Sequence, residues 1–462
     1  MKMNYSEARE YLKNVNKLGS ILGLNTIKEL LKRLGNPQNE LKVVHIAGTN
    51  GKGSIMTFVQ NILMESGYKV GRYCSPAVFN EREIIRINDE YISEEQSADL
   101  LTRIKEKCDS MHSEGLPHPT SFEIETAEAL MFFKEQNCDI ALIECGMGGE
   151  TDATNVFEKV LCSVIATISL DHTQFLGSTI EEITKVKSGI IKENCPVVMS
   201  KQTVEAENVI KKVCKQKNSE LIIPTEQDLE NVEIDGLTTK VTYKASNNKE
   251  YILNLQALGT YQIKNAKTAV EVALVLDKAL TEKTNICDES DKNNSTGMKN
   301  NINNSGNTIE KNIKKGIEKT VWPGRMEVIS KEPLIIIDGA HNPGAVLELR
   351  KTLDLYFTNK RITFIMGVLS DKDFSKEAEI IADRAERIIT ITPNNSRGLD
   401  GHKLAETLVK YNHNVQVADS LKQAAEESID TIKENRADMI LAFGSLSYLG
   451  ELKQVVRLIC NH

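Results

Sequence analysis

The sequence lacks several features that would place it in other classes of protein. It has no apolar run long enough to span a membrane, and residues 1–20 lack the apolar segment of a secretory signal. Its nine cysteines form no C-x-x-C pair, which argues against a zinc site or a disulfide framework. Basic residues are not in excess, since the formal net charge is −8. We therefore expect a cytoplasmic protein with reduced thiols, and neither a membrane nor a nucleic acid as its partner.

Apolar, β-branched segments alternate with helical patterns along most of the 462 residues. This alternation predicts α/β domains, each with a mostly parallel sheet and helices on both faces. We expect a larger P-loop-type domain over residues 1–283, in which residues 232–255 alternate like antiparallel strands, and a smaller Rossmann-like α/β domain over residues 317–462. The expected strands are 43–47, 69–73, 139–144, 160–167, 196–199, 334–338, 362–367, 388–392, 415–417 and 439–444. The expected helices of the larger domain include 54–66, 93–114, 123–135, 179–191 and 262–279.

The segment between the two expected domains, residues 284–316, has a different composition. It is rich in Asn, Lys, Ser and Gly and contains few apolar side chains. Such a segment buries too little surface to offset the entropy lost when a chain is ordered. We interpret it as a flexible linker or insertion. A functional Asn-rich binding tract is the alternative.

A short loop between an expected strand and an expected helix carries the strongest functional signal. Glycines allow the backbone N–H groups of such a loop to point at an anion, and the start of the helix adds its positive dipole end. Lys52 adds a full charge next to these groups. We therefore predict a nucleoside triphosphate site, with a glycine-rich turn that binds nothing as the alternative. The loop consists of Gly48, Thr49, Asn50, Gly51, Lys52, Gly53 and Ser54.

This loop departs from the common pattern G-x-x-x-x-G-K-[ST]. Ile46 stands where the first Gly is needed, and the hydroxyl comes one residue late, at Ser54. The loop matches instead the G-T-N-G-K-G-S loop of ligases that join amino acids to carboxylates. Further matches follow in the same order to about residue 450, among them Trp322–Glu327 and Ile335–Pro343. The sequence resembles the folylpolyglutamate synthase/dihydrofolate synthase family, a branch of the Mur ligase superfamily, which implies a Mur-type central domain followed by a ligase domain.

Two alternative functions stay open at this point. One is another amino-acid ligase of the Mur superfamily. Peptidoglycan-precursor ligases of that superfamily carry a whole UDP-binding domain before the phosphate loop, and the roughly 45 residues that precede it here are too few for one. The other is a non-catalytic, nucleotide-dependent regulator. The shifted loop and the two later motifs argue against it.

A Mg²⁺ site is expected where polar side chains follow the strands. Glu144 ends an apolar strand, and a carboxylate at the end of a parallel strand beside a phosphate loop can hold Mg²⁺. A histidine that the family carries after a Ser-Pro pair is missing, since Ala77 takes its place. The resemblance implies two Mg²⁺ ions, with ligands from Ser54, Ser75, Glu144 and His172.

The resemblance also assigns substrate, nucleotide and catalytic residues. Phe122 lies in a segment similar to the family's pteridine pocket, where an aromatic ring suits stacking on a heterocycle. Lys187 matches a lysine that is carbamylated in these ligases. The implied substrate contacts are Phe122, Glu123, Asp152, Ser396 and Arg397. The implied nucleotide contacts beyond the loop are Gln262, Asn265, Arg325 and Asp338, and the implied catalytic residues are Lys52, Lys187, Asp338 and His341.

The implied reaction is an ATP-dependent ligation that uses Mg²⁺. ATP phosphorylates the carboxylate of dihydropteroate or of a reduced folate, and the amine of L-glutamate then attacks the acyl phosphate. Closure of the second domain over the first would exclude water from this intermediate. We expect a monomer. The sequence leaves open whether the enzyme makes dihydrofolate, extends polyglutamate tails, or does both.

Overall fold

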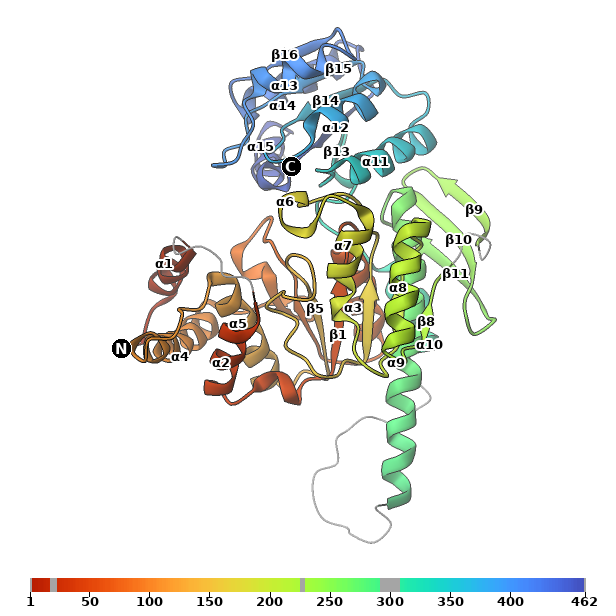
Figure 1. The fold of residues 1–462 in the computed structure, drawn as a ribbon. Helices are drawn as coiled ribbons and strands as arrows, with labels where there is room; N and C mark the ends of the chain where they lie inside the picture. The colour runs from red at the N-terminus through yellow and green to blue at the C-terminus, as the bar shows by residue number, and fades with distance from the viewer. Residues whose placement is uncertain (1, 17–22, 225–228, 291–307, 461–462) are drawn as a thin grey trace.

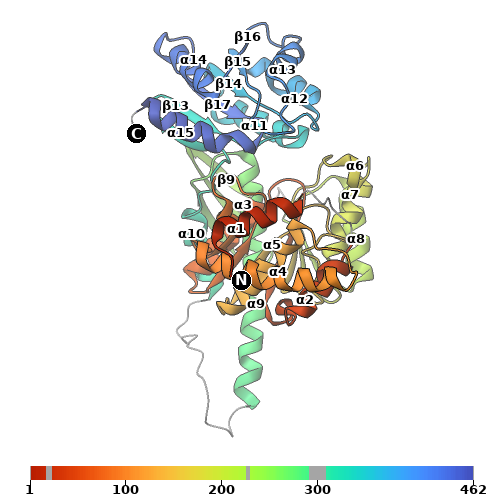
Figure 2. The same cartoon turned by 90° about the vertical axis from the view of Figure 1, so that its left-hand side faces the viewer.

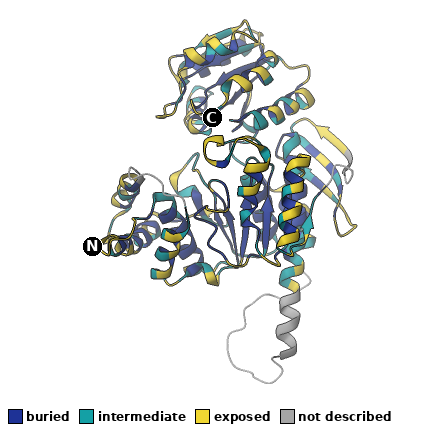
Figure 3. Ribbon diagram, in the orientation of Figure 1, coloured by how far each residue is buried: buried dark blue, intermediate teal, exposed yellow. Residues whose placement is uncertain are grey.

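The computed structural model describes residues 2–16, 23–224, 229–290 and 308–460, with the backbone alone for 229–231 and 282–290. Two layered α/β bodies lie one above the other, and the second, drawn in blue, sits over one end of the first (Figure 1). Both central sheets are buried between helices (Figure 3). No helix in the described part of the chain has the length and hydropathy of a membrane-spanning segment.

The first body is built on an eight-stranded sheet with the order β4-β3-β2-β5-β1-β6-β7-β8. The strands from β2 to β8 in this order run parallel, whereas at the other edge β3 pairs antiparallel with both β2 and β4. The carboxyl ends of β2, β5, β1 and β6 therefore meet at one edge of the sheet, where ligands bind in open α/β folds. The strands are β1 (Val43–Ala47), β2 (Val70–Tyr73), β3 (Ile85–Ile87), β4 (Glu90–Tyr91), β5 (Ile140–Glu144), β6 (Cys162–Ile165), β7 (Val197–Met199) and β8 (Leu221–Ile222).

Helices cover both faces of this sheet (Figure 2). The two faces have separate apolar cores. Helix α3 is buried on almost every side, because it lies between the sheet and two further helices. One face carries α3 (Lys52–Glu65), α9 (Thr260–Ser290) and α10 (Ile309–Glu318). The other carries α1 (Tyr5–Asn16), α2 (Asn25–Arg33), α4 (Glu94–Ser113), α5 (Ser121–Glu135), α7 (Ile180–Lys187) and α8 (Val204–Gln216), and the short α6 (Thr173–Leu176) precedes α7.

A small antiparallel sheet packs beside α9 and α10, as residues 232–255 predict. Its middle strand alternates buried and open positions, so that Val241 and Tyr243 face the core of the first body. This period-2 alternation is the signal that the sequence carries. The sheet consists of β9 (Leu229–Asp235), β10 (Thr238–Lys244) and β11 (Glu250–Leu255).

The second body has a six-stranded sheet with the order β12-β13-β17-β14-β15-β16, parallel except for the edge strand β12. Helices α11, α12 and α13 cover one face, and α14 and α15 cover the other. The expected α/β fold class, with two mostly parallel sheets, is confirmed. The strands are β12 (Glu327–Lys331), β13 (Leu334–Ile337), β14 (Ile362–Met366), β15 (Arg387–Thr390), β16 (Val415–Val417) and β17 (Met439–Phe443). The helices are α11 (Pro343–Tyr356), α12 (Phe374–Ile381), α13 (Gly401–Leu408), α14 (Leu421–Lys433) and α15 (Leu449–Cys460).

The structure corrects the interpretation of residues 284–316 at both ends. Helix α9 continues to Ser290, and α10 begins at Ile309. Helix α10 packs on α3 of the first body and buries Ile309, Ile313 and Ile317 in its core. These isoleucines recur every four residues, a helical period that the Asn-rich composition obscures. Residues 291–307 of the predicted linker lie outside the described residues.

The packing of α10 can be tested by removing one methyl group. Ile313→Val is expected to lower the free energy of unfolding by about 1 kcal/mol, because it leaves a small gap between α10 and α3. Lys314→Ala, on the exposed side of the same helix, is the matched control and should change stability little. Denaturant unfolding measures both. Equal stability of Ile313→Val and the wild type would instead place residue 313 in a solvated linker.

Candidate active site

The phosphate loop joins β1 to α3, and its backbone requires glycine at two positions. Gly48 and Gly51 have φ of +151° and +91°. A Cβ at Gly48 would lie 2.7 Å from Cβ of Ala166, and a Cβ at Gly51 would lie 2.6 Å from Oδ1 of Asn265. The loop is therefore pressed between the end of β6 and helix α9. Helix α3 has no side-chain cap, so its first-turn N–H groups are available to an anion.

Lys52 and Glu144 face each other at the carboxyl edge of the sheet. The Lys52 ammonium lies 3.5 Å from Glu144 Oε1 and also donates to the carbonyls of Gly48 and Thr49. The Cys74 thiol donates to Glu144 Oε2 at 2.6 Å. The Glu144 carboxylate is buried, and its two oxygens are held by groups from the ends of β1 and β2. A carboxylate held in this way beside a phosphate loop suits a divalent cation.

Lys187 brings a second ammonium to the same loop. It is the last residue of α7, is 5% exposed, and donates from Nζ to the Gly48 carbonyl at 3.0 Å. Burial lowers the pKa of Lys187 to about 8, and the nearby charge of Lys52 adds to this effect. A buried lysine with such a pKa is neutral far more often than a surface lysine at the same pH.

A buried ion pair connects the two bodies opposite the phosphate loop. Asp171, in the loop after β6, pairs with Lys372 of the second body at 2.7 Å, and both side chains are less than one-tenth exposed. Burial alone would raise the pKa of Asp171. The Lys372 ammonium, with smaller contributions from His172 and His341, outweighs burial and lowers this pKa to about 2. Asn342, the N-cap of α11, donates to Asp171 and exchanges hydrogen bonds with Asn50 of the phosphate loop.

Two histidines stand beside this contact as neutral imidazoles. Burial lowers the pKa of His341 to about 4, and the charge of Lys372 acts in the same direction. His341 Nδ1 lies 2.7 Å from the Gly339 carbonyl, while Nε2 faces Asp171 at 4.0 Å. Burial also lowers the pKa of His172, which caps α6 in a left-handed backbone conformation. Neutral imidazoles can accept a proton or bind a metal ion.

Asp338 directly follows β13 and is held by both bodies. It is 3% exposed and accepts hydrogen bonds from the Tyr261 hydroxyl and from the backbone N–H groups of Met326 and Ala340. Burial raises the pKa of Asp338, although these hydrogen bonds favour its charged form. The guanidinium of Arg325 packs against Gly339, the residue that follows Asp338.

Gln262 and Asn265 lie one turn apart at the start of α9, as their spacing predicts, and Asn265 donates to Gln262 at 3.0 Å. Both side chains are buried, and Asn265 contacts the phosphate loop at Gly51. Nε2 of Gln262 is buried without a hydrogen-bond partner. This pair therefore presents an unused donor next to the loop.

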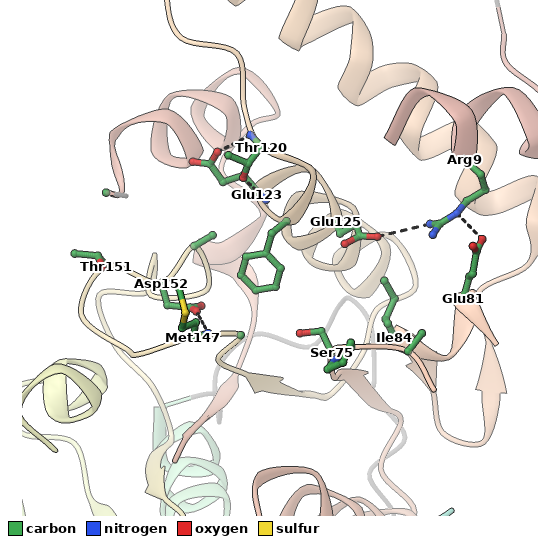
Figure 4. Close-up of a pocket in the computed structure, with 16 residues that line it drawn as sticks. Arg9, Ser75, Glu81, Ile84, Thr120, Glu123, Glu125, Met147, Thr151 and Asp152 are labelled. Carbon is green, nitrogen blue, oxygen red and sulfur yellow. Dashed lines mark hydrogen bonds and ion pairs between the residues drawn. The ribbon is translucent and has the colours of Figure 1, made fainter. Parts of the chain in front are cut away.

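A cavity of about 530 Å³ lies on the α5 side of the sheet (Figure 4). Phe122, Glu123, Asp152 and Ser75, four of the residues predicted to bind substrate or metal, line it together. Gly146 also lines it and follows Glu144 by two residues. The cavity thus brings a phenyl ring, polar groups and the carboxyl edge of the sheet into one place. Such a lining suits a flat, polar heterocycle.

The polar residues of this cavity are held by their own neighbours. Asp152 accepts hydrogen bonds from the N–H groups of Met147 and Thr154. Glu123 accepts from the N–H of Thr120 and so forms the capping box of α5, which gives it a structural role besides lining the cavity. Burial raises the pKa values of Asp152 and of Glu123.

Two predicted substrate residues lie apart from the cavity. Ser396 and Arg397 are exposed in a loop of the second body, where Arg397 pairs with Asp371 at 3.2 Å. The neighbouring Lys372 forms the interdomain ion pair, so this loop borders the contact between the bodies and not the cavity.

No group of three or more His, Cys, Asp and Glu side chains forms a ready metal site within the described ranges. The donors for a Mg²⁺ ion are then the Glu144 carboxylate, hydroxyl groups and an imidazole, completed by phosphate and water. Carboxylate and hydroxyl oxygens suit Mg²⁺, which is usually held by one or two carboxylates together with substrate phosphates. These residues therefore fit the ion.

Sequence reasoning gave no role to several residues that the structure places in the site. Asp171 and Lys372 lie in motifs that the sequence shows, but 201 residues separate them, and nothing in the sequence reveals that they pair. Cys74 and Tyr261 hold the carboxylates of Glu144 and Asp338. In the sequence, Cys74 is marked only by its position after an expected strand, and Tyr261 only by its position before an expected helix. Neither position indicates a function.

Comparisons with known proteins agree with this arrangement. A model of the Mur ligase middle domain matches residues 46–273, and a model of the Mur ligase glutamate ligase domain matches residues 324–446. The chain is 30% identical to the dihydrofolate synthase/folylpolyglutamate synthase of Bacillus subtilis, over 97% of this chain and 98% of the relative. It is 31% identical to the dihydrofolate synthetase of Saccharomyces cerevisiae, over 94% and 97%.

Two similar solved structures are also of folylpolyglutamate synthases. The folylpolyglutamate synthase of Thermotoga maritima is 32% identical, with a TM-score of 0.77 over 98% of this chain and 96% of that one. A complex of a folylpolyglutamate synthase with AMPPCP and folate is 28% identical, with a TM-score of 0.81 over 98% and 100%. The chain therefore belongs to the dihydrofolate synthase/folylpolyglutamate synthase family of Mur ligases, and it is an ATP-dependent ligase.

Proposed function

We propose that this ligase joins L-glutamate to the carboxylate of dihydropteroate, of a reduced folate, or of both. One observation carries the proposal. The cavity lined by Phe122 and Asp152 also takes in Ser75 and Gly146, which follow β2 and β5 at the carboxyl edge of the sheet where Lys52 meets Glu144, so we infer that a heterocycle bound there lies near the phosphate loop. The relatives are a dihydrofolate synthase/folylpolyglutamate synthase and a folylpolyglutamate synthase, which supports these acceptors.

The nucleotide is proposed to bind through the loop Gly48–Ser54, with Gln262, Asn265, Arg325 and Asp338 around it. Contacts of Asn265 with the loop, and of Asp338 with both bodies, support this assignment. A folylpolyglutamate synthase with AMPPCP bound is a structural neighbour, which supports ATP as the nucleotide.

We propose that Glu144, Ser54, Ser75 and His172 hold Mg²⁺, at up to two sites. When bound, the ion would neutralise charge on the phosphates and polarise the transferred phosphoryl group. Lys52 supplies a fixed positive charge at the same place, and Lys187 reaches the Gly48 carbonyl from the other side.

In the proposed reaction, an oxygen of the acceptor carboxylate forms a bond to the γ-phosphorus of ATP as the bond to ADP breaks. The amine nitrogen of glutamate then forms the amide bond to the acyl carbon, phosphate leaves, and the nitrogen loses a proton. The neutral imidazole of His341 can take that proton. The contact between Asp171 and Lys372 keeps the second body over the site and so excludes water.

A substrate panel tests the proposal. The full chain is incubated with MgATP, L-glutamate and either dihydropteroate or tetrahydrofolate, phosphate release is followed, and the products are identified by mass. Glutamate-dependent phosphate release with at least one acceptor is expected. A gain of one glutamate on dihydropteroate identifies dihydrofolate synthesis, and a gain of one or more on tetrahydrofolate identifies polyglutamylation. Phosphate release that is independent of both acceptors would contradict the proposal.

Lys187 is proposed to carry a carbamate in the working enzyme. The ammonium first loses a proton. The neutral amine then attacks carbon dioxide, an N–C bond forms, and a second proton is released, so that a cation becomes an anion. Burial favours this step because it lowers the pKa of Lys187 to about 8. With ¹³C-labelled bicarbonate, a carbamate signal is expected in the ¹³C spectrum of the wild type and not in that of Lys187→Ala.

The activity of Lys187→Ala is expected to fall about tenfold or more and to recover partly with added acetate, which replaces the missing carboxylate. Lys185→Ala changes an exposed lysine two positions away and is the control. Full activity of Lys187→Ala, with no carbamate signal in the wild type, would return Lys187 to a purely structural role.

We also propose that the enzyme acts as a monomer in the cytoplasm. The structure gives eight cysteines as free thiols, and the ninth, Cys287, lies among the residues whose side chains are not described. Free thiols support a reducing compartment. Light scattering on the purified chain tests the oligomeric state.

A further inference from the structure

A second cavity, of about 350 Å³, lies on the opposite side of the sheet from the first. It is enclosed by α3, by β2 and β3, and by residues 319–323, whereas the first cavity lies against α5. None of the residues assigned above to substrate, nucleotide or metal lines it. Those that matter for its chemistry are Gln60, Arg72, Arg86, Asp89, Lys319 and Trp322.

Arg72 is a buried cation without a counter-ion. It is 2% exposed, and its Nε is buried without a hydrogen-bond partner. Its one close partner is the ring of Trp322, at 5.0 Å from the centroid. Burial lowers the pKa of Arg72, but an arginine remains protonated at any physiological pH. The carboxylates of Glu144 and Glu83 favour this charge only from beyond ion-pair distance, so an anion that enters the cavity would stabilise it further.

Two further polar atoms in the cavity wall are buried and unpaired. Nε of Arg86 has no partner, although the same guanidinium donates to the Tyr91 hydroxyl and lies 3.7 Å from Glu83. Oε1 of Gln60 has none either, while its amide nitrogen donates to the Asn88 carbonyl. Buried polar atoms are nearly always satisfied in proteins, so donors and an acceptor left open around one cavity indicate a ligand.

No carboxylate near the cavity forms an ion pair with Arg72 in the described part of the chain, although Glu144 and Glu83 favour its charged form from a distance. Glu65 is already paired with Lys315 and Lys319, and Asp89 is exposed to solvent. The cavity therefore offers guanidinium N–H groups to an oxyanion, and the Gln60 carbonyl oxygen to a neighbouring N–H or O–H group.

We propose that this cavity is a second ligand site, which binds a small oxyanion, a carboxylate or phosphate group, through Arg72 and Arg86. The proposal goes beyond the ligase reaction and does not depend on which acceptor the enzyme uses. The proposed reaction supplies two such oxyanions: the phosphate that it releases and the carboxylates of its substrate glutamate.

Trp322 connects this cavity to the phosphate loop. A Cβ at Gly53 would lie 2.8 Å from Trp322 Cζ2, so the indole packs on the loop with one edge and faces Arg72 with its ring. An anion that draws the guanidinium away from the ring changes the surroundings of the indole. Since Trp322 is the single tryptophan of the chain, its fluorescence reports on this site.

The test is a fluorescence titration of the full chain. The phosphate loop is first saturated with Mg²⁺ and a non-hydrolysable ATP analogue, so that added phosphate cannot act there. Inorganic phosphate and L-glutamate are then titrated separately at constant ionic strength, with chloride as the reference. A saturable change in tryptophan emission is expected with at least one of the two, and the one that saturates identifies the source of the oxyanion.

Arg72→Met keeps most of the side-chain volume and removes the charge, and it is expected to weaken the binding about 10- to 100-fold. Arg457→Met changes an exposed arginine of α15 and should bind as the wild type does. If Arg72→Met does not fold, Arg86→Met on the same cavity is expected to weaken binding in its place. No saturable change with either anion in the wild type, or unchanged affinity in the folded variants, would overturn the proposal. Turnover is not measured here, so failure of this site and failure of the proposed ligase reaction are distinguishable.

Discussion

Lys52→Ala is expected to lower kcat about 10²- to 10³-fold. The Lys52 ammonium sits at the start of α3, 3.5 Å from Glu144, where charge develops on a phosphoryl group in transfer. A fixed positive charge stabilises this transition state more than the bound nucleotide, so kcat should fall more than the affinity for ATP. Rapid-quench or steady-state assays with saturating ATP measure the effect.

The control for this variant is Lys42→Ala. Lys42 is exposed and lies just before β1, at the opposite end of the strand that leads into the phosphate loop. Its removal should leave kcat within about twofold of the wild type. Circular dichroism and thermal unfolding verify that Lys52→Ala is folded, because the substitution also leaves Glu144 without its ammonium partner. A folded Lys52→Ala enzyme with nearly normal kcat would remove Lys52 from the catalytic residues.

The larger elements of the fold were predictable because their signals are local. The strand Val43–Ala47 is a short β-branched and apolar run, interrupted only by His45, before a glycine-rich loop, and the structure places β1 at the same residues. The period-2 pattern near Val241 and Tyr243 likewise identifies an antiparallel sheet. Helix α10 was missed because only three isoleucines in an otherwise polar segment mark its buried face.

The sequence predicted which residues form the candidate site, but not how they are arranged. The resemblance proposes Phe122 and Asp152 for the substrate and Lys52 for the nucleotide, but the shared cavity and the distance between Lys52 and Glu144 arise from the packing of separate strands. The contact of Asp171 with Lys372 shows the limit most clearly. Two residues 201 positions apart meet because the second body packs over the loop after β6, and no local pattern encodes that geometry.

The second cavity could not be predicted from the sequence either. Arg72 occupies a strand position that reads as an ordinary polar interruption in an apolar run. The structure shows that its side chain points to the α3 side of the sheet, against Trp322, where no carboxylate pairs with it. A buried charge without an ion-pair partner is recognised only once its neighbours are known, so it could not be predicted from the sequence.

Glu144→Gln is expected to lower kcat/KM about 10²- to 10³-fold at low Mg²⁺ concentration. The variant keeps the shape of the side chain, so the contacts near Lys52 and Cys74 are retained in outline, while the negative charge disappears. Mg²⁺ prefers charged oxygen ligands, and the loss of a carboxylate weakens its binding more than the loss of any neutral donor. The variant should therefore require a higher Mg²⁺ concentration for half-maximal activity and recover part of its activity when Mg²⁺ is raised.

The measurement is the Mg²⁺ dependence of kcat/KM at fixed total ATP, for the wild type and for two variants. Glu150→Gln is the matched control, because Glu150 is an exposed carboxylate in the loop that follows Glu144. Its Mg²⁺ dependence should be that of the wild type. A shift in Glu144→Gln alone places the ion at the end of β5, between the phosphate loop and the substrate cavity. The same Mg²⁺ requirement in all three enzymes would show that Glu144 is not a ligand, and its hydrogen bond from Cys74 and its contact with Lys52 would then serve only to hold the loop.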